Sequence, residues 1–239
     1  KRLPVMTRSQ LAEYEQVLAD YVKVLGERGL TVAPSEVHAV GGDPVTPYCI
    51  QPRYGRLLVA DLRTCDKHLI EKRMTQFCRL VNASIGDGIG LDAQVSNWAV
   101  AGDDLVYLDV TTPLVQDSEG RQRLDLGLFI ASLPWAMRGL VRRFLLSEIL
   151  SHYYAARPAL LDAVANLHKE RAVDAIPALL ASANAVLDRP VTTDEARKYY
   201  RQDALMWEVL QRLRRADRWW QRAVRRRRYP FLLPGRIER

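Results

Sequence analysis

The stretch GLDAQVSNWAVAGDDLVYLDV, residues 90–110, places three polar side chains around a short hairpin pattern. Two apolar runs are separated by the turn sequence Gly-Asp-Asp at 102–104, which is typical of a β-hairpin. Asp92 precedes the hairpin, Asn97 starts it and Asp109 ends it. Since an antiparallel hairpin brings its two ends together, Asn97 and Asp109 are expected to lie side by side, with Asp92 close by.

Composition limits the class of protein. A chain of 239 residues with 48% apolar content can bury a sizeable core and is expected to form one domain or two closely packed lobes. Its most apolar stretch, 126–137, is too short for a membrane span and is followed by arginines, so no span is expected. The three cysteines, Cys49, Cys65 and Cys78, form no CxxC pair, which is typical of a cytoplasmic protein.

The other elements are predicted from caps, turns and apolar spacing. A capping-box pattern at Thr7 followed by apolar residues at helical spacing predicts a helix over 7–28. The region 36–51 contains two short strands around a Gly-Gly-Asp-Pro turn. Asp66 is the expected cap of an amphipathic helix that ends before Gly86, and the pattern after 124 is helical.

The three polar side chains of the opening stretch suit phosphoryl transfer. Asn97 and Asp109 offer the hard oxygen donors that Mg²⁺ prefers when substrate phosphates complete its ligands. A third carboxylate, Asp92, can orient a hydroxyl and accept its proton. The D-x4-N spacing by itself is weak, because the chain has 17 aspartates. The structural alternative is that Asp92 forms a turn or caps a helix and that Asn97 bonds its own backbone.

This arrangement resembles the catalytic segment of the protein-kinase-like superfamily, in particular its small-molecule branch of aminoglycoside- and choline-kinase-like phosphotransferases. The resemblance implies that Asp92 is the catalytic base and that Asn97 and Asp109 hold the metal. It also implies an α+β, two-lobed fold, with a small and incomplete β-containing N-lobe at 1–54 and a mainly helical C-lobe at 55–239 that carries the catalytic loop 90–112. The segments KRLP and LDVTTPL are similar to an uncharacterised actinobacterial kinase-like family.

The resemblance further implies a nucleotide site in the N-terminal part. Lys1 would bind the phosphates, and a glutamate of the first helix would pair with it. Glu15 is favoured for this role because it lies on the flank of the buried stripe of that helix. The backbone near Gln51 and Arg53, at a hinge over 51–55, would hold adenine. A flexible terminus is the structural alternative for Lys1.

The chain also departs from the family pattern. Gly90 and Leu91 stand where the family has the His-Gly or His-Arg that braces the catalytic loop, and Asp109 is followed by Val110 and Thr111 with no glycine. No Gly-rich phosphate loop and no GxxxxGK motif occurs in the chain. The first strands are therefore either upstream of Lys1 or lost, which leaves an inactive pseudokinase or nucleotide-binding scaffold as an alternative.

The positive charge is concentrated at one end. The net charge is +7, and residues 190–239 carry 14 Lys and Arg against 6 Asp and Glu, whereas the rest of the chain is close to neutral. The arginine segment 212–228, with its tryptophans, favours contact with nucleic acid or another polyanion. The alternative is a helix with a solvated arginine face whose leucines and tryptophans pack on the body. The leading hypothesis is nonetheless an ATP- and Mg²⁺-dependent phosphotransferase acting on a hydroxyl of a small molecule.

Overall fold

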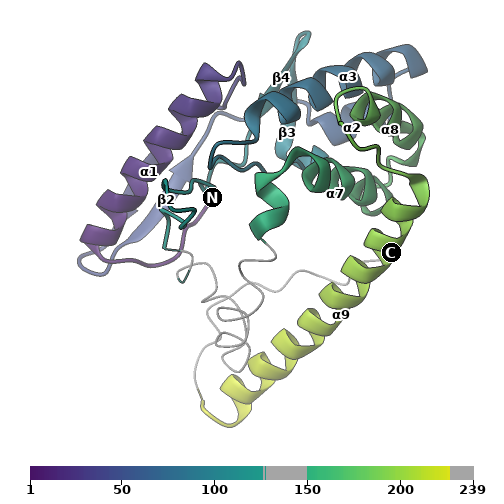
Figure 1. The fold of residues 1–239 in the computed structure, drawn as a ribbon. Coiled ribbons are helices and arrows are strands. Elements are labelled where there is room, and N and C mark those ends of the chain that lie inside the picture. Colours follow the sequence, from purple (N-terminus) through teal and green to yellow (C-terminus); the bar gives the residue numbers. More distant parts are fainter. Residues whose placement is uncertain (126, 128–149, 227–239) are drawn as a thin grey trace.

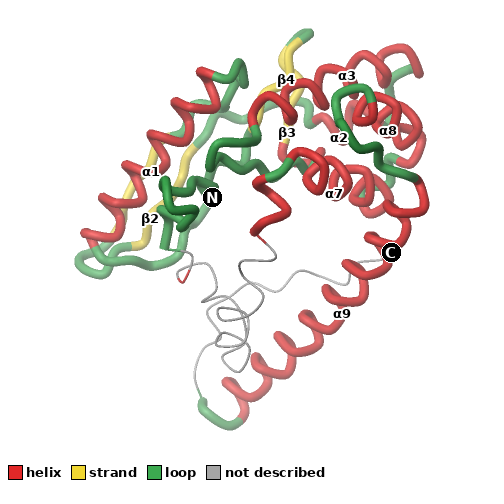
Figure 2. Tube along the Cα trace, viewed as in Figure 1, coloured by secondary structure: helices red, strands yellow, loops and turns green. Residues whose placement is uncertain are grey.

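The computed structural model describes residues 1–125, 127 and 150–226, and of residues 203–207 it describes the backbone alone. Over this part the protein is α+β and mostly helical, which confirms the predicted class; Figures 1 and 2 show that the strands form two separate hairpins. In chain order the elements are α1 (Arg8–Glu27), β1 (Glu36–Val40), β2 (Thr46–Ile50), α2 (Leu58–Leu62), α3 (Lys67–Ser84), β3 (Trp98–Ala101), β4 (Asp104–Tyr107), α7 (Ala156–Lys169), α8 (Ile176–Asn184) and α9 (Thr193–Ala223).

Helices α1 and α3 begin at their predicted caps. The Thr7 hydroxyl accepts a hydrogen bond from the Gln10 amide, and the Gln10 side chain accepts one from the Thr7 amide, so the capping box is complete. The Asp66 carboxylate accepts from the amide of Leu69 at 2.9 Å at the start of α3. Both helices bury one stripe, because their apolar residues recur at helical spacing.

The first hairpin carries the amino-terminal segment on its second strand. β1 and β2 pair antiparallel, from Glu36 opposite Ile50 to Val40 opposite Thr46. Residues 1–6 run along the other side of β2, where the Leu3 amide donates to the Pro47 carbonyl at 2.9 Å. The Cys49 amide likewise donates to the Lys1 carbonyl at 2.9 Å. The backbone of Lys1 is thus held against β2, near the middle of the molecule, where Figure 1 marks the N-terminus.

The second hairpin forms where the sequence of residues 90–110 predicts it. β3 and β4 pair antiparallel, from Trp98 opposite Tyr107 to Ala101 opposite Asp104. Gly102 adopts a φ of 63°, which the tight turn requires and which glycine tolerates at no steric cost. The second strand starts at Asp104, one residue before the predicted start, because this residue still pairs across the turn.

A buried charge network that sequence reasoning missed fixes this hairpin to α2 and α3. Asp61 is completely buried, with Arg56 Nε 2.6 Å from one carboxylate oxygen and Arg73 Nε 3.6 Å from the other. These contacts satisfy charge but are poorly directed as hydrogen bonds. Arg73 also donates to the carbonyls of Gly102 and Asp103, at 2.8 and 2.6 Å. The hairpin turn is therefore tied to α3 through a buried arginine.

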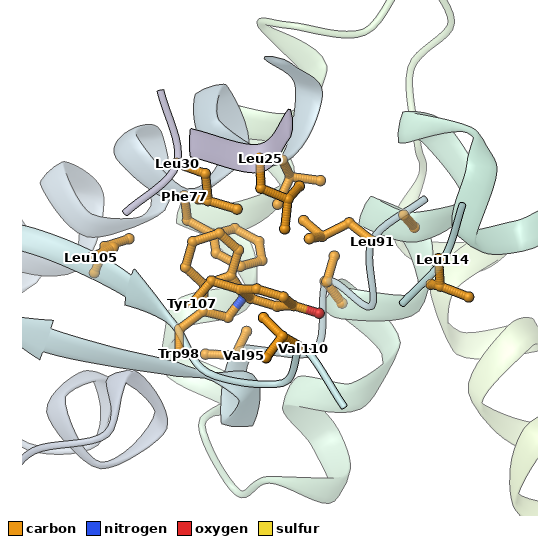
Figure 3. Close-up of a cluster of buried hydrophobic side chains, with 14 of the residues drawn as sticks. Leu25, Leu30, Phe77, Leu91, Val95, Trp98, Leu105, Tyr107, Val110 and Leu114 are labelled. Carbon is orange, nitrogen blue, oxygen red and sulfur yellow. The ribbon is translucent and has the colours of Figure 1, made fainter. Parts of the chain in front are cut away.

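The main hydrophobic core is one continuous cluster, beside a small second cluster of Ala33, Ala99 and Val106. It joins residues of α1 and the first hairpin to residues of α3, the second hairpin and α7. Figure 3 shows its centre, where Trp98 packs edge-on against Phe77 and Tyr107, with ring centroids 5.1 and 5.2 Å apart. The residues assigned to the two lobes thus share one core.

The long helix α9 leads away from the body after packing on α7 (Figure 1). Arg157 of α7 donates to Glu195 of α9 at 2.8 Å. The expectation that the carboxy-terminal tryptophans pack on the body is wrong: Trp219 and Trp220 are exposed, as is Leu213. The apolar stretch 126–137, except Gly127, lies outside the described residues. Among the helices that are described, none is long and apolar enough to cross a membrane.

Candidate functional site

The polar residues Asp92, Asn97 and Asp109 of the stretch 90–110 lie between buried apolar residues that anchor them. Leu91 and Trp98 are fully buried on either side of Asp92 and Asn97. Asp109 lies between the buried residues Tyr107 and Val110. Figure 3 shows these anchors converging from the loop and the hairpin into one core. The alternation of anchors and polar residues positions the polar groups at the edge of the core.

The loop and the two ends of the hairpin meet, as the turn pattern predicts. The amide of Leu108 donates to the Asn97 carbonyl at 2.8 Å, which places the two hairpin ends side by side. The Asn97 side chain donates from Nδ2 to the Asp92 carbonyl at 3.4 Å, which leaves its Oδ1 free of that bond. Asp92 Oδ1 accepts from the amide of Gln94 at 3.1 Å. This is the hydrogen bond of an Asx turn, so Asp92 also has the structural role considered above.

Lys1 and Asp109 form an ion pair across 108 positions of sequence. Lys1 Nζ lies 3.0 and 3.3 Å from the two carboxylate oxygens of Asp109. It also donates to the Thr111 hydroxyl at 2.6 Å, and that hydroxyl donates to Asp109 at 2.7 Å. Thr111 is buried and was identified from the sequence only as the position where the family pattern has a glycine. Its contact with Lys1 depends on the pairing of residues 1–6 with β2, which no local pattern predicts.

The two carboxylates of the site differ in their affinity for protons. Burial raises the pKa of Asp92, and the nearby charge of Asp109 raises it further, against the hydrogen bond from Gln94. Burial also acts to raise the pKa of Asp109, but the Lys1 ammonium and the hydrogen bonds from Thr111 and Lys1 hold it below its usual value. Asp109 therefore tends to stay ionised, whereas Asp92 is the better proton acceptor.

Tyr14, rather than Glu15, is the residue that α1 directs at this site. The Tyr14 hydroxyl donates to the Thr111 carbonyl at 3.1 Å, and the ring is buried. Burial, with the nearby Cys49 and Asp109, raises the pKa of this phenol well above its usual value. Glu15 is exposed and has no ion pair or hydrogen bond among the described residues. The structure therefore does not bring Glu15 to Lys1, because one step along a helix rotates a side chain by about 100°.

The loop before Asp92 lacks the histidine of the kinase-like pattern, and other contacts hold it in place. The Tyr21 hydroxyl donates to the Gly90 carbonyl at 2.8 Å and is hydrogen-bonded to the phenol of Tyr107. The amide of Gly90 donates to the Leu114 carbonyl at 2.9 Å. A Cβ on Gly90 would lie 3.0 Å from the Tyr153 carbonyl oxygen and 3.1 Å from Leu114 Cβ, so close packing requires glycine here. The loop is thus held by a buried tyrosine and by tight packing.

The predicted hinge residues differ in their contacts. Gln51 follows β2 and donates from Nε2 to the Leu108 carbonyl at 2.7 Å and to the Ser35 hydroxyl at 2.9 Å. It therefore links the end of the first hairpin to the residue before Asp109. Arg53 is exposed, and its side chain has no hydrogen bond or ion pair among the described residues.

Two hollows on the surface lie away from this cluster. One, of about 670 Å³, lies over α3 and the turn of the second hairpin, with Lys72 and Asp103 in its lining. The other, of about 750 Å³, lies between α3 and α8. Neither is lined by Asp92 or Asp109. Within the described residues no group of three or more His, Cys, Asp or Glu side chains could hold a metal, so a cation at Asp109 would need Asn97 or substrate oxygens as well.

Comparisons with known proteins identify a family. No curated protein and no solved structure matches the chain. A family model described as "Family of unknown function (DUF6206)" matches residues 1–218, which is most of the sequence and includes every residue of the candidate site. The chain therefore belongs to the DUF6206 family.

Proposed function

We propose that the protein is an ATP- and Mg²⁺-dependent phosphotransferase that acts on a hydroxyl of a small molecule. The observation that carries the proposal is the convergence of Lys1 on Asp109, beside Asn97 and Asp92. An amine, an ionised carboxylate, an amide and a carboxylate of raised pKa are the groups that bind phosphates and activate a hydroxyl. Three of these groups come from residues 90–110, and the fourth comes from Lys1.

The order of elements around these residues supports the proposal. The resemblance implies a lysine on a strand before the first helix, and Lys1 lies on the extended segment that pairs with β2 and leads into α1. The strand pair β1 and β2 follows the helix, and Gln51 at its end contacts the residue before Asp109. On this proposal residues 1–54 would be the small lobe, and the helical part from 55 onward would be the large one.

Each residue would act through its own charge or hydrogen bonds. Asp92, whose pKa is raised, would accept the proton of the substrate hydroxyl. The Lys1 ammonium would bind phosphate oxygens and orient them toward that hydroxyl. Asp109, kept ionised, and the side-chain oxygen of Asn97 would hold Mg²⁺, which when bound supplies positive charge to the phosphates.

An inactive, nucleotide-binding scaffold is the second candidate, and one observation favours it. Lys1 pairs with Asp109 and Thr111, while Glu15 is exposed, so the lysine–glutamate pair that the resemblance implies is not formed. Such a protein would bind ATP without transferring its phosphate. The two candidates agree on the site and differ in turnover.

Two measurements test the proposal. Adding ATP with Mg²⁺ is expected to raise the melting temperature, because a ligand that binds the native state stabilises it. ATP turnover with candidate hydroxyl acceptors is then compared among the wild type, Asp92→Ala, Asp109→Ala and the control Glu13→Ala, an exposed residue of α1. Loss of turnover in the first two variants and its retention in the control would support the enzyme.

Other outcomes separate the alternatives. A melting temperature that rises with ATP, without turnover in the wild type, would support the scaffold. A melting temperature that ATP and Mg²⁺ leave unchanged would contradict both candidates. Wild-type turnover that survives in Asp92→Ala would contradict the role of Asp92 as the base.

A further inference from the structure

The carboxy-terminal half of α9 and the residues that follow it, 208–226, here called the distal half of α9, expose apolar side chains to solvent. In this half the side chains that are buried are polar, namely Gln211 and Asp217. Five large apolar side chains are instead between 40% and 64% exposed: Val209, Leu213, Trp219, Trp220 and Val224. A helix that packs on a protein core normally shows the opposite pattern, with apolar residues inward. These side chains are therefore available to a partner other than the described body.

Four of these side chains form one stripe. Val209, Leu213, Trp220 and Val224, here called the α9 stripe, are separated by 4, 7 and 4 positions. At about 100° per residue they fall within an arc of about 60°. On one side of the stripe, Arg212, Trp219 and Arg215 lie about 60°, 80° and 120° around the helix from Val209. Residues 209–226 contain seven arginines and one carboxylate, Asp217, a net charge of +6.

We infer that the distal half of α9 binds the surface of an anionic lipid bilayer. The α9 stripe would enter the boundary between headgroups and acyl chains, while the arginines beside it pair with lipid phosphates. Tryptophan suits this boundary because its ring is apolar and its indole N–H is polar. The arginines prevent the helix from crossing the bilayer, so it would lie along the surface.

Nucleic acid is the other polyanion to consider, and the apolar residues count against it. Arginines could contact the phosphates of either partner, and Trp219 and Trp220 could stack on bases. The aliphatic side chains Val209, Leu213 and Val224 would have no partner on a phosphate backbone, yet they are aligned with Trp220. A bilayer provides both the negative charge and the apolar interior that this helix face needs.

The test is co-sedimentation of the full chain with vesicles. We expect binding to vesicles in which a third of the phosphatidylcholine is replaced by phosphatidylglycerol, little binding to phosphatidylcholine alone, and weaker binding at high salt. Changing Trp219 and Trp220 together to alanine should abolish most of the binding. Arg212→Glu with Arg215→Glu, on the side of the stripe that carries Trp219, should lower the partition coefficient about tenfold or more.

A matched pair of substitutions controls for net charge. Lys198→Glu with Arg201→Glu makes the same charge change on exposed positions in the first half of α9, eight or more positions before Val209, and should retain most of the binding. In the wild type, brominated lipids should quench tryptophan fluorescence, which reports insertion even if the double tryptophan variant unfolds. This inference does not depend on phosphoryl transfer. A negative result in the ATP turnover assay would therefore leave the proposed bilayer binding unaffected.

Several results would overturn the inference. These are equal binding by the charge control and the Arg212/Arg215 variant, no quenching by brominated lipid, or vesicle binding that survives loss of both tryptophans. Binding of duplex DNA without vesicle binding would assign the helix to nucleic acid. A dimer that dissociates in the tryptophan variant, without vesicle binding, would assign the stripe to a contact between two copies of the chain.

Discussion

At the level of single residues, the main feature of the site is that Asp92 and Asp109 differ in their affinity for protons. Asp92 and Asp109 are both partly buried, yet the pKa of Asp92 is raised and that of Asp109 is lowered. Burial raises the pKa of Asp92, whereas Lys1, which contacts both oxygens of Asp109, and the hydrogen bonds from Thr111 lower the pKa of Asp109. A pair of carboxylates with opposite shifts offers one proton acceptor and one permanent negative charge.

Asp92→Asn is expected to stabilise the fold and to abolish turnover. Because its pKa is raised in the folded protein, ionised Asp92 lowers stability once the pH exceeds the value of the unfolded chain. The amide keeps an oxygen for the Gln94 bond but cannot act as a base, so kcat should fall by about 10²- to 10⁴-fold. Melting curves should show the gain at pH 7, shrinking as the pH falls through the pKa of Asp92. A lower melting temperature at pH 7 would contradict this electrostatic account.

Tyr14→Phe should destabilise the protein by about 1 kcal/mol, since it removes the only side-chain hydroxyl bonded to the buried Thr111 carbonyl among the described residues. Chemical denaturation measures the change. Tyr48→Phe is the control, because Tyr48 is exposed and its hydroxyl has no partner in the described part of the chain. Equal effects of the two substitutions would show that the Thr111 contact contributes little.

At the scale of elements, local signals predict the helices and hairpins well. Caps at Thr7 and Asp66 locate α1 and α3, and the turn at 102–104 locates the second hairpin. These signals depend on neighbours in sequence, so they can be read without knowing the fold. The pairing of residues 1–6 with β2 and the Asp61–Arg73 contact could not be predicted, because both depend on how separate elements pack together.

The contrast between local signals and contacts of separate elements also explains which parts of the candidate site could be predicted. Asn97 and Asp109 could be placed together because one hairpin connects them. The choice of Glu15 over Tyr14 depended on which face of α1 meets the rest of the molecule at that point, and apolar spacing locates the buried stripe without saying what it faces. Thr111 and Tyr21 act through contacts with distant segments, so their contribution needed the structure.

Gly90→Ala should destabilise the loop before Asp92 by about 1–3 kcal/mol, because the added methyl group meets the backbone of Tyr153 and the side chain of Leu114. Gly26→Ala in α1 is the matched control. Its Cβ would meet nothing within 4 Å, and alanine favours a helix by about 0.5–1 kcal/mol. Denaturant midpoints compare the two variants. A neutral Gly90→Ala would mean that the loop can move aside.

Asp61→Ala should cost about 3–5 kcal/mol, since it leaves Arg73 buried without its carboxylate. The turn of the second hairpin would lose its support, because Arg73 also holds the carbonyls of Gly102 and Asp103. Glu71→Ala removes an exposed pair with Lys67 and should change stability by less than about 0.5 kcal/mol. Urea unfolding measures both, and similar costs would contradict the importance of burial.

At the scale of the whole molecule, one core predicts one unfolding transition. The apolar cluster continues from α1 through the second hairpin to α7, and Tyr14, Tyr21 and Gln51 bond across the middle of the molecule. Calorimetry should therefore give a single peak for this body, with equal calorimetric and van't Hoff enthalpies. Two peaks would mean that residues 1–54 and the helical part fold independently.

The ion pair between Lys1 and Asp109 has a consequence for how the site would be filled. The lysine acts as an internal counterion, so a free divalent ion approaches a carboxylate whose charge is already balanced. A triphosphate offers the ammonium group another anion and so releases the carboxylate for the incoming metal. We therefore expect a divalent metal to bind Asp109 only when a nucleotide is present to draw Lys1 away, so the nucleotide would control metal binding.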